Sequence, residues 1–232
     1  MTTTDEGGYV PGEVHVANKW IEQASITWAG CVPRVLDVAI SIIVLIVALP
    51  LLLIVALLIR LESPGPAVFR QERAGRNGRS FKLIKFRGMY VDAKDRWPEL
   101  YNYSFDDEEV AALRFHPHYD PRVTRIGGFI RRTSIDELPN FLNVLRGDMA
   151  IVGPRPEIPE MLPYYGDHLE ELLGIRPGVT SLPKVTGRDG HTFAETLELE
   201  LEYIRNRSML LDLKIMARTI RTVLRQDGVL GG

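Results

Sequence analysis

Cysteine is nearly absent, since the 232 residues contain only Cys31. One cysteine excludes an internal disulfide framework and any metal site built from several thiolates. A large net charge is also missing: the formal value of −2 gives no global attraction for nucleic acid, so no nucleic-acid partner is expected. The first 33 residues hold one basic residue, Lys19, and no signal peptide is expected there. The composition, 45% hydrophobic and 25% charged, is typical of a globular chain.

Charged side chains are absent from residues 38–59, which are almost entirely Ala, Val, Ile and Leu. As a helix, these residues would reach about 33 Å, close to the hydrocarbon thickness of a bilayer. We therefore expect a membrane helix over residues 34–60. Pro50 interrupts it and predicts a break or kink near residues 48–50. The helix could cross the bilayer or turn back, and the residues alone leave both topologies open.

A basic segment directly follows the apolar one. Residues 60–87 contain two Glu and eight Lys or Arg. Such a segment favours the cytoplasmic side and attracts anionic lipid headgroups.

The remaining pattern predicts a mostly helical α+β body with a small β element. Strands are expected over residues 68–71 and 81–86, joined by an Asn-Gly turn. Helices are expected over 122–145 (as two, meeting near 132–134), 157–174, 193–206 and 208–226. The last places Leu210, Leu213, Ile220 and Leu224 on one side and Lys214, Arg218, Arg221 and Arg225 in a basic stripe. It is either an amphipathic interfacial helix or a core helix with a solvated face. The expected organisation is a tail (1–33), the membrane helix (34–60), a compact body (61–228) and a short tail (229–232).

Two adjacent acids, Asp136 and Glu137, lie in the segment 131–140. Ser134 and Glu137 have the spacing of a helix capping box, which is a purely structural interpretation. A carboxylate at a helix N-terminus is expected to be stabilised in its ionised form. An ionised Asp is a competent nucleophile toward phosphorus.

Attack on a diphosphate also requires cations around the phosphate oxygens. The candidates for binding substrate phosphate or nucleotide are Lys85, Arg87, Arg155, Arg176 and Arg188. Arg155, Arg176 and Arg188 lie in Pro/Gly-rich loops, where a fixed backbone can orient a guanidinium group. For each arginine taken alone, a structural salt bridge is the alternative.

Several longer segments follow one another in a recognisable order. They are Lys85–Arg87, Arg131–Pro139, Asn143–Met149, Val152–Pro156, Arg176–Thr180, Gly187–Arg188 and Leu211–Ile215. With the Pro-interrupted apolar helix, they make the sequence resemble the small monotopic phosphoglycosyl transferases. This bacterial sugar transferase family initiates surface-glycan assembly on polyprenyl phosphate, and the resemblance runs from about Pro33 to Gly228.

The resemblance implies a transferase in which Asp136 and Glu137 are catalytic and Mg²⁺, held by Asp136, is the cofactor. Asp136 would take a sugar phosphate from a UDP-sugar, release UMP, and pass the group to undecaprenyl phosphate. Glu137 would prepare the acceptor or help to place the metal. Pro50 would break a re-entrant helix that dips into one leaflet, at the cytoplasmic face of the bacterial inner membrane. Membrane lipids and downstream glycosyltransferases are the expected partners, and a homodimer is left open.

The sequence departs from the family pattern at Gly88, where Thr or Ser is usual, and at Ser181, Leu182 and Lys184, where Gly, Trp and Gln are common. We expect these departures to alter nucleotide or sugar contacts and to leave the Asp136–Glu137 pair untouched. Two rival functions remain. One is a catalytically silent membrane scaffold that recruits glycosyltransferases, against which the intact acids argue. The other is a peripheral lipid-binding module, against which the uncharged segment argues.

Overall fold

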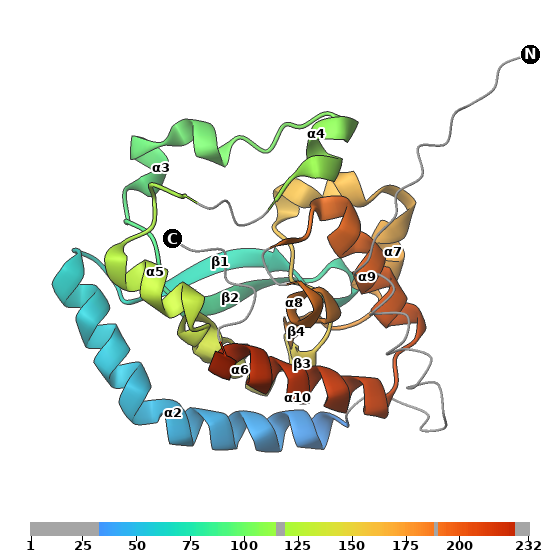
Figure 1. Ribbon diagram of the computed structural model, residues 1–232, viewed down its shortest axis with the longest axis horizontal. Helices are drawn as coiled ribbons and strands as arrows, with labels where there is room; N and C mark the ends of the chain where they lie inside the picture. The colour runs from blue at the N-terminus through green and yellow to red at the C-terminus, as the bar shows by residue number, and fades with distance from the viewer. Residues whose placement is uncertain (1–32, 115–118, 188–189, 226–232) are drawn as a thin grey trace, which may run out of the picture.

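The computed structural model describes residues 33–114, 119–187 and 190–225. Helices predominate and two small sheets lie among them (Figure 1), so the expectation of a mostly helical α+β fold is confirmed. Apart from Pro33, the two predicted tails lie outside the described residues.

The elements, with 3-10 helices written η, follow in chain order. They are α2 (Arg34–Glu62), β1 (Val68–Ala74), η1 (Arg76–Gly78), β2 (Ser80–Phe86), α3 (Ala93–Arg96), η2 (Pro98–Tyr101), α4 (Asp107–Ala112), α5 (Arg125–Arg132), η3 (Ile135–Asn140), α6 (Phe141–Arg146), β3 (Ala150–Val152), η4 (Pro159–His168), α7 (Leu169–Leu173), β4 (Gly178–Thr180), α8 (Leu182–Thr186), α9 (Phe193–Arg205) and α10 (Met209–Arg225).

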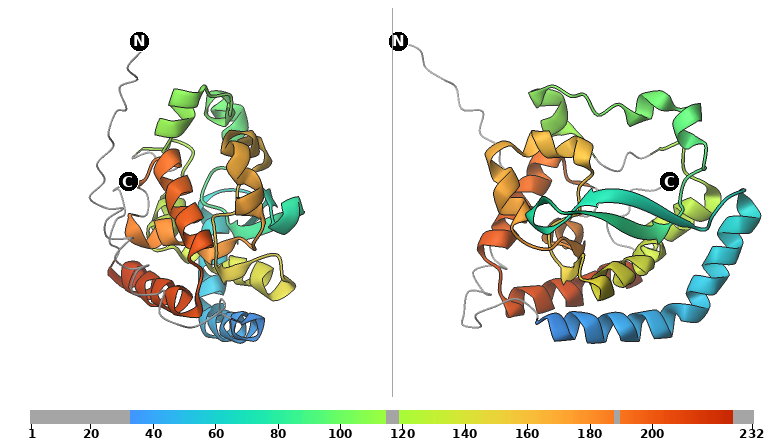
Figure 2. Two further views of the ribbon diagram at one scale, coloured as in Figure 1. Left: turned by 90° about the vertical axis from the view of Figure 1, so that its right-hand side faces the viewer. Right: turned by 180° about the vertical axis from the view of Figure 1, so that it is seen from behind.

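The predicted membrane helix is a single α-helix that extends two residues further, to Glu62. Its mean hydropathy is 3.5 over the most apolar window, and only 11% of that window is buried against the protein. A helix this apolar and this exposed is not the core helix of a soluble domain. Figures 1 and 2 show a sharp bend near its middle, and Pro50 lies inside the helix. The proline therefore kinks the helix without ending it.

Both ends of α2 are attached to the rest of the protein. Arg34 donates hydrogen bonds to the C-terminal carbonyl oxygens of α6. The Asp37 carboxylate accepts a backbone N–H from β3 at 3.2 Å. At the other end, Glu62 accepts a backbone N–H from the first turn of α5 at 3.0 Å. These contacts fix the helix relative to the elements that carry the candidate site.

The predicted strands form the antiparallel hairpin β1–β2, in which Val68 pairs with Phe86 and Ala74 with Ser80. The connecting turn contains Asn77 in the left-handed conformation, with φ of 58°. Asn is one of the few residues that adopt this conformation readily. The hairpin prediction is thus confirmed, and β2 packs against η3.

A second pair of strands, β3 and β4, is parallel. Glycine is required where they meet, because a Cβ on Gly178 would lie 2.1 Å from the nitrogen of Gly153. This close approach sets the path of the loop after β3, which carries Arg155.

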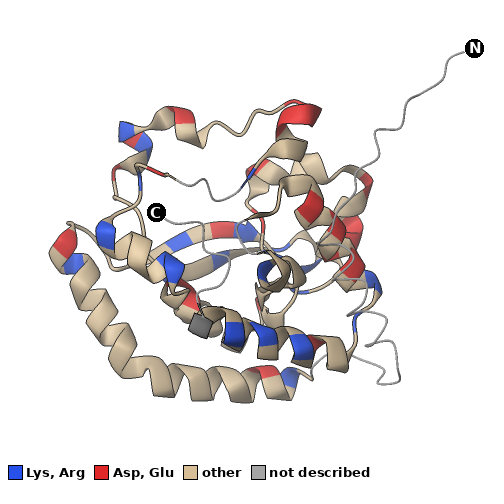
Figure 3. Ribbon diagram, in the orientation of Figure 1, with Lys and Arg blue, Asp and Glu red and all other residues tan. Residues whose placement is uncertain are grey.

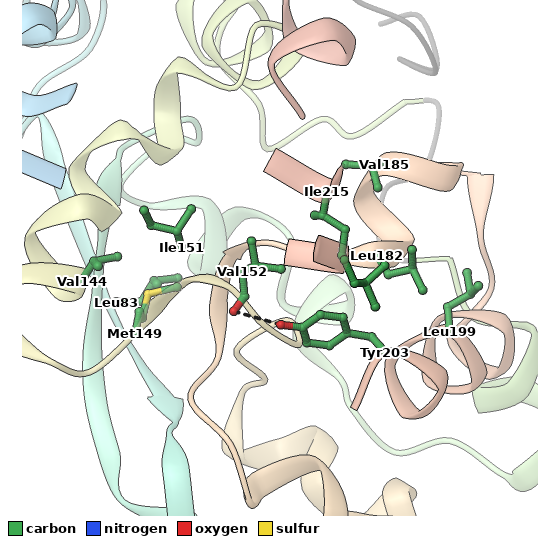
Figure 4. Close-up of a cluster of buried hydrophobic side chains, with 11 residues drawn as sticks. Leu83, Val144, Met149, Ile151, Val152, Leu182, Val185, Leu199, Tyr203 and Ile215 are labelled. Carbon is green, nitrogen blue, oxygen red and sulfur yellow. Dashed lines mark hydrogen bonds between the residues drawn. The ribbon is translucent and has the colours of Figure 1, made fainter. Parts of the chain in front are cut away.

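The main core includes side chains of β2 and β3. Its buried members include Leu83, Val144, Leu182 and Leu199, from four different elements. Tyr203 of α9 reaches across this core, and its hydroxyl contacts the carbonyl oxygen of Val152 (Figure 4).

The segment 157–174 is not the single helix that was predicted: η4, which Gly166 interrupts with φ of 48° and ψ of −131°, is followed by α7. In α10, Leu211 and Ile215 enter the core, whereas Leu213 and Ile220, on the predicted apolar side, are 43% and 63% exposed. The helix carries two apolar faces, and the periodicity identified the outer one. That exposed face belongs to a helix on the same side of the body as the first half of α2 (Figures 1 and 2).

Candidate active site

Asp136 and Glu137 lie on η3, the short 3-10 helix between α5 and α6. The residue that precedes it, Ser134, is left-handed with φ of 56° and makes no side-chain cap. The predicted capping box is therefore wrong. An N-cap residue usually has an extended backbone, whereas the Ser134 backbone is left-handed. Glu137 is held instead by a contact with another element.

Glu137 forms an ion pair with Lys184 on α8. The Lys184 ammonium also lies 3.3 Å from the carbonyl oxygen of Val179, and Ser181 caps the first turn of α8. The side chains of Lys184 and Glu137 are 22% and 34% exposed, so solvent only partly screens their attraction. The expectation that the departures at 181–184 leave the acidic pair untouched is wrong, because Lys184 binds one of its members.

The two carboxylates have opposite pKa shifts. Desolvation and the neighbouring Glu137 raise the pKa of Asp136 to about 6, against the opposing effect of Lys85. Desolvation also acts to raise the pKa of Glu137, but Lys184 and Arg155 outweigh it and lower the value. We expected the helix N-terminus to stabilise the ionised form of the carboxylate. For Asp136 this expectation is wrong, because its pKa is raised. With its pKa near 6, Asp136 is still mostly ionised at neutral pH.

Lys85 of β2 faces Asp136 across the packed β2–η3 contact. Desolvation lowers the pKa of Lys85 to about 8; Asp136 opposes the shift, while Arg73 and Arg155 add to it. Arg131 of α5 also acts on Asp136. Four basic side chains, Lys85, Lys184, Arg131 and Arg155, thus act on the two acids. This excess of positive charge suits a diphosphate substrate. Figure 3 shows basic residues on several separate elements in this part of the body.

The structure brings together some predicted phosphate ligands and separates others. Lys85 and Arg155 both belong to the cluster around the acids. Arg176 instead acts electrostatically on Asp37 in α2. Arg188 lies outside the described residues.

The structure gives Arg87 a different role from the predicted one of phosphate binding. Its side chain is buried, and its guanidinium donates hydrogen bonds to the carbonyl oxygens of Ile59, Ser63 and Pro64 at the end of α2. Carbonyl groups at a helix C-terminus lack partners within the helix, and an arginine satisfies them. Arg87 is therefore a helix-terminating residue whose two terminal nitrogens donate to these carbonyl groups.

We predict that Arg87→Met destabilises the protein by about 1–3 kcal/mol, because it leaves buried carbonyl groups without donors. The KM for the nucleotide substrate of the folded fraction should stay unchanged. Thermal unfolding and substrate titration of one preparation test this. A large rise in KM with unchanged stability would restore Arg87 as a phosphate ligand.

The sequence did not identify Lys184 or Arg131 as functional residues. Arg131 was inside a recognised segment, and Lys184 was noticed only as an unusual residue.

Comparison with known proteins identifies the family. A model described as "Bacterial sugar transferase" matches residues 28–226. The chain belongs to this bacterial sugar transferase family.

Relatives within the family carry specific names. The chain is 43% identical over 165 residues to galactosyl transferase CpsE of Streptococcus agalactiae, covering 71% of this chain and 36% of that protein. It is 42% identical over 204 residues to the UDP-glucose:undecaprenyl-phosphate glucose-1-phosphate transferase of Caulobacter vibrioides, covering 84% and 70%. It is 36% identical over 199 residues to the exopolysaccharide production protein ExoY of Sinorhizobium fredii, covering 86% and 88%. The chain thus spans little more than a third of CpsE and most of the other two relatives.

Proposed function

We propose that this sugar transferase moves a sugar 1-phosphate from a UDP-sugar to undecaprenyl phosphate, as the first membrane step of surface glycan assembly. The observation that carries the proposal is the acidic pair of η3 inside a cluster of four basic side chains. The family membership and the printed names of its relatives support it.

The reaction would proceed in two displacements. An Asp136 carboxylate oxygen attacks the sugar-linked phosphorus, and the bond from this phosphorus to the bridging oxygen breaks, so UMP leaves with its electron pair. The resulting aspartyl phosphosugar is then attacked at the same phosphorus by an oxygen of the acceptor phosphate. The Asp136 oxygen leaves as a carboxylate, and the product is polyprenyl diphosphate sugar. One diphosphate bond replaces another, so no further energy source is needed.

The surrounding cations have distinct tasks in this scheme. Lys85 lies beside Asp136 and would hold the phosphoryl oxygens of the attacked group. Arg155 lies toward Glu137 and would bind the second phosphate. Lys184 compensates the charge of Glu137, so that an anionic donor meets less negative charge.

Mg²⁺ would be held by Asp136 together with the diphosphate oxygens. Within the described residues no group of three or more His, Cys, Asp or Glu could hold a metal ion. Mg²⁺ is usually bound by one or two carboxylates plus substrate phosphates and water, which is the donor set that Asp136 and a diphosphate would provide. The ion would neutralise charge on the transferred group.

The membrane would hold both substrates close to the site. The apolar exposed surface of α2 suits a lipid environment, and the exposed Leu213 and Ile220 of α10 suit its interface. We propose the re-entrant topology, because Arg34 and Glu62 tie the two ends of α2 to one body and Pro50 lies between them. A crossing helix would place those ends on opposite sides of the bilayer.

We predict that a tag placed before Pro33 is inaccessible to a membrane-impermeant reagent in intact cells and becomes accessible after lysis. A tag after Gly232 reports the side of the body and should behave identically. Labelling of the first tag alone in intact cells would refute the re-entrant arrangement.

We predict an alkaline decline in activity that depends on Lys85. With its pKa near 8, Lys85 is charged and able to bind phosphate below this value and loses its proton above it. The kcat/KM for the donor should therefore fall between pH 8 and 9. Arg stays protonated throughout this range, so in Lys85→Arg the fall should be shallower. A decline as steep as in the wild type would exclude Lys85 as its cause.

The proposed function is tested by UMP release from UDP-glucose, UDP-galactose and other UDP-sugars, with Mg²⁺ and undecaprenyl phosphate, using detergent-purified protein. Release with one donor would exclude the silent scaffold. Silence across the panel from folded protein, with or without acceptor, would favour it.

A further inference from the structure

An exposed aromatic side chain lies next to the candidate site. Phe69 of β1 is 40% exposed. It pairs with Lys85 in the β1–β2 hairpin, and directly paired residues of two strands lie on the same face. The Lys85 ammonium is 5.6 Å from the centre of the Phe69 ring. The ring therefore borders the cation that acts on Asp136, and the mechanism proposed above does not use it.

The same face of β1 continues with two polar side chains. Side chains at alternate positions of a strand share a face, so Phe69, Gln71 and Arg73 form one row. The exposed fraction decreases along this row, from the exposed Phe69 through the half-buried Gln71 to the buried Arg73. The row thus runs from the surface into the protein, with Lys85 beside its outer end.

The Arg73 guanidinium determines the orientation of the Gln71 amide. Arg73 Nη2 donates a hydrogen bond of 2.7 Å to Gln71 Oε1. A guanidinium group has donors only, so the amide oxygen must face it. The amide NH₂ group of Gln71 therefore remains as a donor for a ligand.

The loop that carries Arg155 is attached to this row. Arg73 Nη1 donates a hydrogen bond of 2.9 Å to the carbonyl oxygen of Pro156. Two buried acids also contact Arg155: Glu200 accepts its backbone N–H at 2.7 Å, and Glu157 lies 3.5 Å from its Nε. These contacts fix Arg155, the proposed ligand of the second phosphate, relative to the row on β1.

We propose that Phe69 and Gln71 form the subsite for the uracil base of the donor. The base stacks on the ring face opposite the Lys85 ammonium, and the Gln71 NH₂ group donates a hydrogen bond to one of the base carbonyl oxygens. This inference rests on the proposed function, in which Lys85 and Arg155 hold the two phosphates of a UDP-sugar.

The position of Lys85 agrees with this arrangement. A stacked base lies about 3.5 Å from the ring, so it would be roughly 9 Å from the Lys85 ammonium. In a UDP-sugar, the ribose and the first phosphate separate the base from the sugar-linked phosphorus. Phe69 and Asp136, which both border Lys85, thus match the two ends of this part of the donor.

The polar neighbours of the ring favour a base over a lipid chain as its ligand. A polyprenyl chain offers no acceptor to an amide NH₂ group, and it would desolvate the Lys85 ammonium without compensation. Uracil has a flat π face for the ring and two carbonyl oxygens for the amide. Stacking of a base on an aromatic side chain contributes about 1–3 kcal/mol in nucleic-acid complexes.

Binding of UDP and of inorganic diphosphate, both with Mg²⁺, separates the base from the phosphates. Calorimetry on the full-length protein in detergent measures both Kd values. Phe69→Leu keeps an apolar side chain without a flat ring, so the Kd for UDP should rise about 10-fold and that for inorganic diphosphate less than about 3-fold. Phe69→Trp keeps a flat ring and should stay within about 3-fold of the wild type for both ligands.

A second variant tests the hydrogen bond. Gln71→Glu keeps an oxygen for Arg73 but replaces the NH₂ donor with another acceptor. The Kd for UDP should rise about 3- to 10-fold more than the Kd for inorganic diphosphate. The matched control is Val68→Ala, at a residue that is 37% exposed on the opposite face of β1, and it should leave both Kd values unchanged.

An unchanged Kd for UDP in Phe69→Leu would overturn the proposal, and so would an equal loss for the two ligands. An effect of Phe69→Leu on the KM for the lipid acceptor alone would overturn it as well, because the ring would then contact the lipid chain. UMP release by the wild type is measured separately. A protein that releases UMP but fails the binding tests would refute only the uracil subsite, and the expected binding pattern without UMP release would refute only the transfer.

Discussion

Asp136→Asn is expected to reduce UMP release at least about 10³-fold, because the amide oxygen cannot form the acyl phosphate that links the two displacements. The substitution is nearly isosteric, and Asp136 carries a raised pKa at its partly buried site. Removing this charge should leave the free energy of unfolding unchanged or slightly higher. Turnover and thermal unfolding measured on one preparation test both statements.

The matched control is Asp95→Asn, since Asp95 is an exposed acid on α3. It should retain wild-type turnover. If Asp136→Asn kept wild-type turnover, Asp136 would not be the nucleophile, and Glu137 would be the next carboxylate to test.

Lys184→Met is expected to lower kcat/KM for the donor about 10- to 100-fold, which corresponds to the loss of a charged hydrogen-bond partner. Without Lys184, the pKa of Glu137 rises, and two adjacent carboxylates depend on the remaining cations. Both the affinity for an anionic donor and the rate should fall. Steady-state kinetics with donor and acceptor varied separately would measure the effect.

Two further variants separate charge from hydrogen bonding at this position. Lys184→Arg keeps the charge and should lose least, whereas Lys184→Gln keeps only a donor and should lie between Arg and Met. Lys94→Met, at an exposed lysine of α3, is the matched control. Equal activity of Lys184→Met and the wild type would show that the ion pair with Glu137 has no part in the reaction.

Two elements were predicted correctly from local sequence. An uncharged apolar run with one proline predicted the kinked helix α2, and an Asn-Gly turn between two short β-type segments predicted the hairpin β1–β2. Both depend on periodicity and backbone preferences within a few residues.

The residue roles that could not be predicted depend on contacts between segments that are distant in sequence. Arg87 has the charge expected of a phosphate ligand, yet its burial against the end of α2 uses its donors for carbonyl groups. Lys184 is 47 residues from Glu137 in sequence, so no local pattern connects them. In α10, the helical period was correct, but only packing determines which of the two apolar faces enters the core.

The candidate site was only partly predicted, because some of its residues have a local sequence signal and others do not. Asp136, Glu137, Lys85 and Arg155 were found because recognised segments contain them. The buried acids Glu157 and Glu200 had no such signal. Glu157 follows directly after the recognised segment Val152–Pro156, and Glu200 lies in an acidic amphipathic helix, where a Glu is normally a surface residue. Their burial follows from the way α9 packs against the loop after β3.

The most direct test of the central claim is the intact mass of the protein after incubation with a UDP-sugar and Mg²⁺ in the absence of undecaprenyl phosphate. The donor is the one identified by UMP release. The proposed mechanism predicts that wild-type protein gains the mass of one sugar phosphate while releasing an equal amount of UMP, and that Asp136→Asn gains none. Adding acceptor should remove the adduct. The contradicting result is turnover when the acceptor is present, together with neither adduct nor UMP release when the acceptor is absent. That result would indicate direct transfer between the two substrates.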